Sequence, residues 1–401
     1  MVDQIKNLKA SADRIRQAVE NKERIIIYGD ADLDGVSASI MAGEIVKNAG
    51  GNVAAYYFPN RENEGYGITP TALAKLAPLA PALLVAVDLG IGNFKEVKLA
   101  RQAGFSTLII DHHEILDGVP EADIIVDPKQ PGDGSSFKFF CAASLVFKLA
   151  EEFFGPAFSG SLRQSFAELA ALATIADMMP REAGNIDIID EGLMTVAKSF
   201  RPGLRAFFET DAFFENDSRN FNNRLNKIIA VLNVRDMRGG APAAFELLTT
   251  DSLERSEELI KEFLEINKLR RQKIDGVVEE IKNRISARKA SSAGQRSGNG
   301  YSLIFEGSAD WDLNLLGTVA SILNIDYKIP VFIYKKLDSE SQGTVRSTNE
   351  IDSVALMKNC RDLLITFGGH PKASGFRAKT ENLEKFKECL MNNLDKKDAK
   401  N

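Results

Sequence analysis

The sequence contains no long apolar segment. Nowhere do its 401 residues approach the ~20 consecutive apolar residues that a helix needs to cross a bilayer. The first twenty residues are polar and amphipathic, unlike a secretory signal with its apolar centre. We therefore expect a cytoplasmic protein that makes no membrane contact.

The chain also has few cysteines and no excess of positive charge. The three cysteines, Cys141, Cys360 and Cys389, lie far apart, are odd in number and show no CxxC spacing, which fits a reducing interior. The formal net charge is -6, whereas proteins that grip nucleic acid through a general electrostatic surface are usually basic. Any contact with nucleic acid is therefore expected to be local or assisted by a metal ion.

Histidine is rare, and its positions are informative. The chain has only three histidines: His112 and His113 are adjacent, and His370 follows a Gly-Gly pair. Histidine is a versatile acid, base and metal ligand, so a single one is often uninformative. Here none lies outside a candidate motif, which makes all three candidates for a functional site.

The length of the chain predicts more than one domain, because one hydrophobic core usually stops growing below this size. Short β-branched runs alternate with helical patterns in the first part of residues 1–250, which predicts an α/β domain with a parallel sheet buried on both faces. The remainder of that domain, about 141–250, has mainly helical patterns. Residues 251–300 are expected to form a long connecting helix and a Gly/Ser-rich linker, and residues 301–401 a smaller α/β domain.

Aspartates stand at the ends of the expected strands. Asp30, Asp88 and Asp111 each lie at or just past the end of an apolar run, where parallel sheets bind their ligands. In the segment GDADLDG, Asp30, Asp32 and Asp34 alternate and would share one side of an extended chain. Such crowded carboxylates repel unless cations neutralise them, and Mg²⁺ and Mn²⁺ prefer carboxylate oxygen. An acidic turn that caps a helix is the alternative interpretation of this segment alone.

Two further motifs add candidate ligands. In LIIDHHE, Asp111, His112 and His113 directly follow a buried run, and such a polar group is poor core material. Imidazole nitrogen suits Mn²⁺, Zn²⁺ or Fe²⁺ better than Mg²⁺. In TIADMMP, Asp177 interrupts an apolar segment and needs a cation or a salt bridge. Together these motifs offer enough ligands for two ions, which clamp a phosphate and activate water, with Asp88 as the candidate bridging acid.

The order of these motifs resembles a known family. GDADLDG, VAVDLG, LIIDHHE and TIADMMP are similar to the four signature motifs of the DHH phosphoesterases, and FGGHPKASGF resembles the Gly-Gly-His motif of their DHHA1 domain. The segments NRENEGYG, VDPKQPGD and TVRST resemble the RecJ-like branch of single-strand-specific exonucleases. The resemblance extends from about Ile25 to Leu390.

The resemblance implies a role for each residue. Asp32 and Asp88 would hold one ion, and Asp34, Asp88, His112 and Asp177 would hold the other, with Asp30 as a further ligand. The ions would be two Mn²⁺ or Mg²⁺. The remaining candidate residues would act on or grip the phosphate: the catalytic set is Asp111, His113 and His370, and the substrate-binding set is Arg346, Ser347, Gly368, Gly369 and His370.

The function that the resemblance implies is a metal-dependent phosphodiesterase. It would be a RecJ-like exonuclease that hydrolyses single-stranded nucleic acid, DNA or RNA, from the 5′ end to mononucleotides, with repair or replication proteins as partners. The segment LNVRDMRGG departs from the family pattern, so Asn233 and Arg238 align only with a shift. We also expect no room for the extra oligonucleotide-binding domain of bacterial relatives.

Two alternatives stay open at this stage. The first is a hydrolase of short substrates, such as nanoRNA, cyclic dinucleotides or phosphoadenosine phosphate, which the acidic charge and the missing domain favour. The second is a replisome scaffold without catalytic activity. Scaffolds of that kind lose their metal ligands, whereas every expected acid and histidine is present in this chain.

Overall fold

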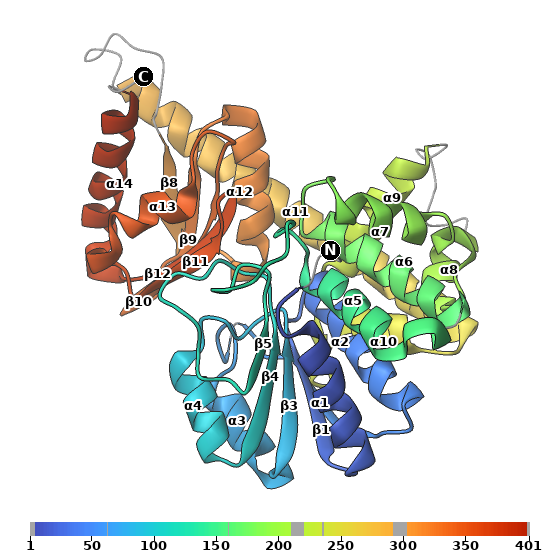
Figure 1. Cartoon of the computed structure of the whole chain (residues 1–401). Coiled ribbons are helices and arrows are strands. Elements are labelled where there is room, and N and C mark those ends of the chain that lie inside the picture. The colour runs from blue at the N-terminus through green and yellow to red at the C-terminus, as the bar shows by residue number, and fades with distance from the viewer. Residues whose placement is uncertain are drawn as a thin grey trace. The chain divides into compact units, whose positions relative to one another are not determined.

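The structure is a computed structural model that divides into two compact units, residues 1–265 and residues 266–401. It describes residues 5–61, 63–158, 160–209, 220–234, 236–291 and 303–398. Among these residues, no helix combines the length and the apolar character that a membrane span requires. Each unit has its own sheet (Figure 1), and each has its own clusters of buried apolar residues.

The sheet of the first unit is parallel throughout, as the sequence predicted. Its strands lie in the order β2-β1-β3-β4-β5, and each neighbouring pair runs parallel. The strands are β1 (Arg24–Gly29), β2 (Val53–Tyr57), β3 (Ala82–Val87), β4 (Phe105–Ile110) and β5 (Ile124–Val126).

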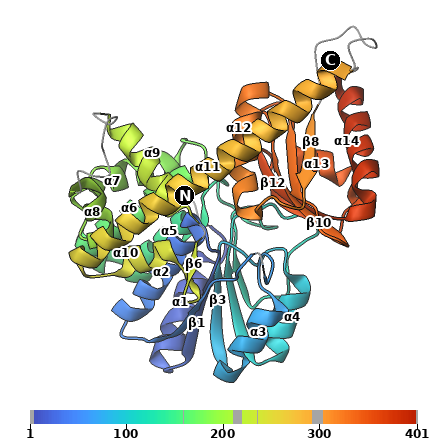
Figure 2. The ribbon, with the colours of Figure 1, turned by 180° about the vertical axis from the view of Figure 1, so that it is seen from behind.

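Both faces of this sheet are buried, which explains why its strands are continuous apolar runs. Side chains alternate between the faces along a strand: Ile25 and Ile27 belong to one core, and Ile26 and Tyr28 to the other. Helices α1 (Leu8–Glu20), α2 (Leu33–Asn48), α5 (Ala142–Phe154) and α6 (Gly160–Ala176) pack into the first core. Helices α3 (Pro70–Leu76) and α4 (Phe94–Gln102) pack into the second (Figure 2).

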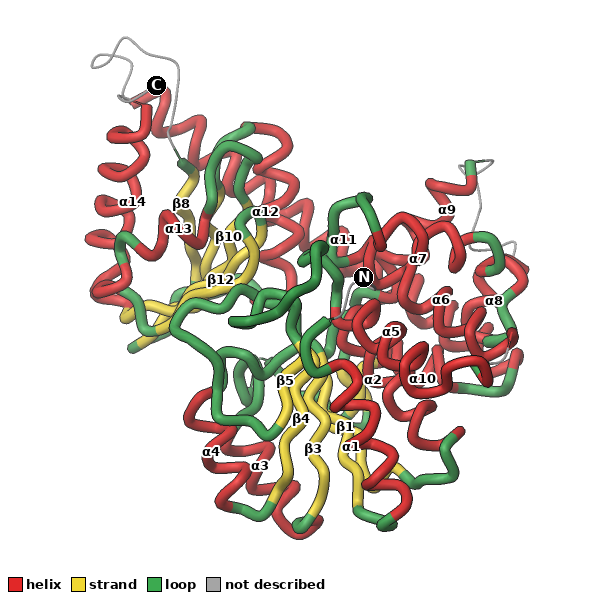
Figure 3. The backbone as a smooth tube through the Cα atoms, in the orientation of Figure 1, coloured by secondary structure: helices red, strands yellow, loops and turns green. Residues whose placement is uncertain are grey.

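The rest of the first unit is mainly helical, as expected for residues 141–250 (Figure 3). After α5 and α6 come α7 (Gly184–Leu193), α8 (Pro202–Glu209), α9 (Phe221–Leu232), the short hairpin β6 (Met237–Arg238) and β7 (Ala241–Pro242), and α10 (Ala243–Thr249). Single 3₁₀ turns are η1 (Ala77–Leu79), η2 (Gly155–Ala157) and η3 (Val196–Lys198).

One long helix, α11 (Leu253–Ser291), belongs to both units. It matches the connecting helix predicted from the sequence. The two units divide within this helix, between Glu265 and Ile266. The expected Gly/Ser-rich linker falls almost wholly outside the described residues, so the domain limits at 250 and 300 stay a proposal.

The second unit is a smaller α/β body with a mixed sheet in the order β11-β12-β10-β9-β8. Only β8 and β9 run parallel, and the other neighbouring pairs are antiparallel. Helices α11 and α12 cover one face, and α13 and α14 cover the other. The elements are β8 (Ile304–Ser308), α12 (Leu313–Tyr327), β9 (Val331–Lys335), β10 (Glu340–Arg346), α13 (Ser353–Lys358), η5 (Arg361–Leu363), β11 (Thr366–His370), β12 (Ala373–Lys379), η6 (Thr380–Asn382) and α14 (Leu383–Asp398).

The cysteines differ from the expectation of a reducing interior. Cys360, just after α13, and Cys389, in α14, form a disulfide, whereas Cys141 is a buried thiol. The two bonded residues are 29 positions apart in the sequence. Their spacing gave no sign of the pairing, because only the packing of α13 against α14 brings them together.

Candidate functional site

Four strands of the first sheet end in the same way. Gly29, Val87, Ile110 and Val126 form one row across β1, β3, β4 and β5, because each pairs with its neighbour in register. The next residue on every one of these strands is an aspartate: Asp30, Asp88, Asp111 and Asp127. The carboxyl edge of the sheet therefore carries a row of acids, three of which the sequence singled out.

The segment GDADLDG makes the transition from β1 to α2. Asp32 caps the helix, and its Oδ1 accepts a hydrogen bond from the Gly35 amide at 3.2 Å. Gly35 is required because a Cβ there would lie 2.5 Å from the Asp30 carbonyl oxygen. Asp34 lies in the first turn of α2 and is 3% exposed. The helix-cap interpretation thus holds for Asp32, but Asp34 is directed into the protein.

His112 is the centre of a group of acids. Its Nε2 lies 3.2 Å from Oδ1 of Asp88, 3.5 Å from Oδ2 of Asp34 and 3.7 Å from Oδ2 of Asp177. Asp88 adopts a left-handed backbone conformation with φ 61°, which is uncommon for a residue with a side chain. Asp177 directly follows the last residue of α6. Residues from β3, β4 and two helix ends therefore meet at one imidazole.

Asp111 and His113 form a separate pair beside this group. Nδ1 of His113 lies 2.7 Å from Oδ1 of Asp111, and the other Asp111 oxygen accepts a hydrogen bond from the Ile91 amide at 2.9 Å. Burial alone would lower the pKa of His113, but the charge and hydrogen bond of Asp111 raise that pKa to about 9. Burial alone would raise the pKa of Asp111, but His113 and His112 bring it below its ordinary value. The pair is therefore charged at neutral pH.

The candidate ligands of the first unit form overlapping sets. Asp34, His112 and Asp177 each offer an atom within 4.8 Å of the others, as do Asp30, Asp32 and Asp88, and also Asp88, Asp111 and His113. Asp88 contacts His112 as well, so it links the first two of these sets. Carboxylate oxygen and imidazole nitrogen are donors that suit Mn²⁺, and carboxylates alone suit Mg²⁺.

The acids raise one another's pKa. Burial, with the charge of Asp32, raises the pKa of Asp34 to about 6, although backbone amides that donate to Asp34 lower it. Burial and the charges of neighbouring acids raise the pKa of Asp88 and of Asp177 well above the ordinary value. Buried carboxylates in this state favour a divalent cation among them, so the residues fit two such ions.

Asp30 has a cation beside it already. The Nε of Arg61 donates to Oδ1 of Asp30 at 3.0 Å, and a terminal nitrogen of the same guanidinium contacts Oδ2. Arg61 also lies 3.7 Å from Oδ2 of Asp32, and its guanidinium stacks on Tyr66, 4.6 Å from the ring centroid. Asp30 therefore differs from Asp34, Asp88 and Asp177, which face His112.

Sequence reasoning missed Arg61, Asp127 and Lys129, and it named Asn233 only as a residue that aligns with a shift. Arg61 lies in NRENEGYG, which we quoted only for its resemblance. Asp127 is fully buried, and burial raises its pKa to about 7. Nζ of Lys129 donates to the carbonyl of His112 at 2.6 Å. Asn233 accepts a hydrogen bond from the Leu33 amide at 3.1 Å and so fixes the start of α2. For Asp127 the signal was present, since it also follows an apolar run.

The candidate residues of the second unit lie at one end of its sheet. Arg346 of β10 and His370 of β11 both pair with Ala373 of β12, so they lie in one row and on the same face. Nε of Arg346 donates to Ser321 Oγ on α12 at 3.0 Å. Ser347 follows Arg346, and its amide donates to the Lys372 carbonyl at 3.0 Å.

The Gly-Gly pair before His370 has a steric explanation. Gly369 has φ 121°, and a Cβ there would lie 2.7 Å from the carbonyl oxygen of Ala373. Gly368 pairs with Gly375 across the strands. The tight hairpin between β11 and β12 thus needs glycine at position 369, whatever ligand approaches it.

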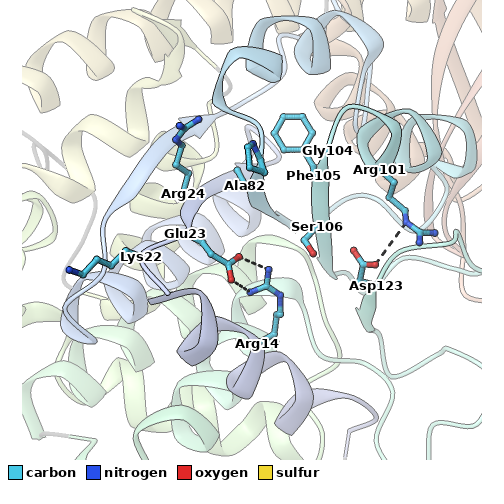
Figure 4. A pocket seen from close by; sticks show the side chains of 11 residues that line it. Arg14, Lys22, Glu23, Arg24, Ala82, Arg101, Gly104, Phe105, Ser106 and Asp123 are labelled. Atoms are coloured by element: carbon cyan, nitrogen blue, oxygen red, sulfur yellow. Dashed lines mark hydrogen bonds and ion pairs between the residues drawn. The ribbon is translucent and has the colours of Figure 1, made fainter. Parts of the chain in front are cut away.

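A hollow of about 600 Å³ lies at the opposite end of the first sheet (Figure 4). Its lining includes Arg24, Ala82 and Phe105, the first residues of β1, β3 and β4. Arg14 and Glu23 form an ion pair at 2.6 Å there. Among the lining residues there is no histidine and no cluster of acids, so this hollow is not part of the candidate metal site.

Two family models match parts of the chain. Residues 24–174 match the model of the DHH family, N-terminal domain, and residues 300–395 match that of the DHHA1 domain. The chain is 31% identical over 396 residues to the single-stranded-DNA-specific exonuclease RecJ of Bacillus subtilis, covering 96% of this chain and 48% of that protein. It is 26% identical to the protein of the same name from Thermus thermophilus, covering 93% of this chain and 52% of that protein. The chain thus spans about half the length of these two relatives.

Solved structures show the same fold. A crystal structure of exonuclease RecJ bound to manganese has a TM-score of 0.74 at 24% identity, with 98% of this chain and 95% of that chain covered. The structure of RecJ from Thermus thermophilus in complex with Mn²⁺ has a TM-score of 0.79 at 23% identity, with 98% of this chain and 55% of that chain covered. The chain thus contains a DHH domain and a DHHA1 domain, and it shares the fold of RecJ.

Proposed function

We propose that the chain is a metal-dependent exonuclease that hydrolyses single-stranded DNA from the 5′ end to mononucleotides. The observation that carries this proposal is the meeting of Asp34, Asp88 and Asp177 around His112 at the carboxyl edge of a parallel sheet. Two sets of donors with a shared acid are the arrangement that two-ion phosphodiester hydrolysis needs.

The sets of donor atoms described above suggest which residues would hold each ion. Asp34, His112 and Asp177 would hold one ion and Asp32 the other, with Asp88 between them. Two divalent ions, when bound, neutralise the phosphate and make water a better nucleophile. Asp30 would hold Arg61 in place beside the second ion, because both of its oxygens contact the guanidinium.

His113 would act on the phosphate as a cation. Its Nδ1 is engaged by Asp111, which holds the ring in place and keeps the imidazole protonated at neutral pH. A protonated imidazole can donate a hydrogen bond to a phosphate oxygen and stabilise the charge that develops there. Asp111 would thus orient His113 rather than bind metal.

The second unit carries candidate phosphate-binding residues of its own. Arg346, Ser347 and His370 lie at one end of its sheet, and Arg346 offers a planar guanidinium that suits phosphate oxygens. Gly368 and Gly369 would let a ligand approach the backbone of β11 closely.

The substrate class comes from the relatives. The curated relatives that the chain resembles are named as single-stranded-DNA-specific exonucleases, and the first of these is 31% identical over almost the whole of this chain. By the same resemblance, repair or replication proteins would be its partners. The cytoplasmic location expected from the sequence stays a prediction.

The test is digestion of single strands labelled at the 5′ or 3′ end, at lengths of 5 and 50 nucleotides, in the presence of Mn²⁺. We expect labelled mononucleotide to appear early from the 5′ label only, and activity to disappear in Asp88→Asn. Asp13→Asn is the matched control, because Asp13 is an exposed acid on α1 that pairs with Arg16. Hydrolysis of the 5-mer alone would indicate the short-substrate hydrolase instead, and failure on both lengths would contradict the proposal.

A further inference from the structure

The carboxylate of Asp34 rests on the start of helix α5. The amide of Ala142 donates to Oδ2 at 2.8 Å, and the amide of Ala143 donates to Oδ1 at 2.7 Å. Both are among the amides that a helix leaves unsatisfied at its start, and the positive end of the helix dipole favours a carboxylate. Cys141, the N-cap residue of α5, makes no side-chain cap hydrogen bond of its own. The position of Asp34 therefore depends on the position of α5.

Asp177 depends on a different helix. It directly follows α6, and its amide donates to the Ala173 carbonyl at 2.9 Å. The amide of Met179 donates to the Thr174 carbonyl at 3.1 Å, and Met178 between them adopts φ 55°. The last turn of α6 therefore fixes Asp177. Asp34 and Asp177 are two of the three acids that face His112, and their separation therefore depends on how α5 packs on α6.

A buried polar cluster, formed by Cys141, Ser144 and Thr174, joins these two helices. All three side chains are fully buried within an otherwise apolar core. Oγ of Ser144 lies 2.8 Å from Oγ1 of Thr174, and Sγ of Cys141 lies 3.4 Å from the same Thr174 atom. Sγ of Cys141 also lies 3.5 Å from Oγ of Ser144.

The directions of these hydrogen bonds follow from the supply of protons. The Thr174 hydroxyl donates to the Ala170 carbonyl at 2.7 Å, so it accepts from Ser144. The Cys141 thiol has one proton to donate. That proton is available to Ser144 or to Asp34, whose carboxylate the thiol also contacts. The cluster thus reaches from α6 to the metal-facing acid itself.

We propose that Cys141, Ser144 and Thr174 are positioning residues that set the spacing between Asp34 and Asp177 and thereby the affinity of one metal position. Polar contacts at an apolar helix interface fix one relative placement of the helices, because any slip leaves a buried group without a partner. Asp88 follows β3 and Asp32 is the N-cap of α2, whereas Asp34 accepts hydrogen bonds from the first amides of α5. The cluster therefore affects the affinity for the ion held by Asp34, His112 and Asp177, and it leaves the affinity for the other ion unchanged. This inference rests on the metal centre proposed above.

The test measures Mn²⁺ binding at equilibrium, with no substrate present. The full chain is freed of metal and titrated with Mn²⁺, and the unbound ion is followed by electron paramagnetic resonance. The variants are Thr174→Val, which keeps the shape and removes the hydroxyl, and Ser144→Ala. Thr174→Ser should restore binding. Thr107→Val is the matched control, since Thr107 is a buried threonine of β4 whose hydroxyl lies 3.2 Å from a carboxylate oxygen of Asp123.

We expect the wild-type chain to bind two ions and the two variants to bind one of them about 10- to 100-fold more weakly, as for other residues that orient a metal ligand. In these variants the affinity for the second ion should stay within about twofold of the wild-type value, and so should both affinities in the Thr107→Val control. Unchanged binding in both folded variants, or equal weakening of both ions, would overturn the inference and leave the proposed function standing. A wild-type chain that binds no Mn²⁺ would overturn both. Thermal unfolding of the metal-free variants identifies any that do not fold.

Discussion

The Nε2 atom of His112 lies 3.2 Å from Oδ1 of Asp88, although the two residues follow different strands of the sheet. The register explains this proximity, because Val87 of β3 pairs with Ile110 of β4, and the chain continues from each into the site. Asp88 is therefore placed between the two sets of donor atoms by strand pairing. A two-ion centre would depend on this one acid more than on any other.

Replacement of Asp88 by Asn should affect both ions. The change keeps the shape of the side chain and removes the charge, so we expect both Mn²⁺ affinities to fall at least ~10-fold and kcat/KM to fall about 1000-fold or more. Calorimetric titration and digestion of single-stranded DNA measure the two effects. Loss of one ion with the other unchanged would show that Asp88 does not lie between them.

The Asp111–His113 pair predicts a dependence of stability on pH. The pKa of His113 is raised from 6.5 to about 9 in the folded chain. Its contribution to stability is therefore fully present below pH ~6.5 and is lost as the pH rises to about 9. In His113→Gln the metal-free chain should be less stable than wild type by about 2 kcal/mol at pH 6, and the difference should shrink by pH 10. Urea unfolding at both pH values measures this, and a difference that grows with pH would contradict the assignment.

In the hairpin of the second unit, replacing either of two glycines by alanine should change the free energy of unfolding by different amounts. Gly369→Ala introduces a Cβ at φ 121°, 2.7 Å from a carbonyl oxygen, and should lower the free energy of unfolding by about 1 to 3 kcal/mol. Gly375→Ala is the control, because its Cβ would meet its nearest atom at 3.5 Å, an ordinary contact. Urea unfolding of both variants makes the comparison, and equal stability of the two would refute the steric explanation.

Asn233 predicts an effect on metal binding at a distance. Its side-chain oxygen accepts a hydrogen bond from the Leu33 amide at the start of α2, beside both Asp32 and Asp34. Asn233→Ala should cost about 1 to 2 kcal/mol of stability and weaken Mn²⁺ binding about 10-fold. Asn48→Ala is the control, since Asn48 is exposed near the far end of the same helix. If the Asn233→Ala variant binds Mn²⁺ with wild-type affinity, Asn233 has no role in metal binding.

The sequence alone was sufficient for the parallel sheet and for three of the four acids in the row at its carboxyl edge. The β-branched runs before Asp30, Asp88 and Asp111 required burial on both faces, and parallel strands bring their carboxyl ends together. The scarcity of histidine also drew attention to His112.

Contacts between distant segments could not be predicted in the same way. Asp34 and Ala142 are 108 residues apart, and nothing in either local pattern shows that a helix start supports that carboxylate. Arg61 reaches Asp30 from a loop with no periodic pattern. The Cys360–Cys389 disulfide depends on helix packing that cysteine spacing does not encode.

The central claim is a two-ion centre at the carboxyl edge of the first sheet. Anomalous diffraction from crystals grown with Mn²⁺ tests it most directly. We predict two peaks about 4 Å apart, one bound by Asp34, His112 and Asp177, the other by Asp32, and both in contact with Asp88. A single peak, or peaks bound by other residues, would contradict the account.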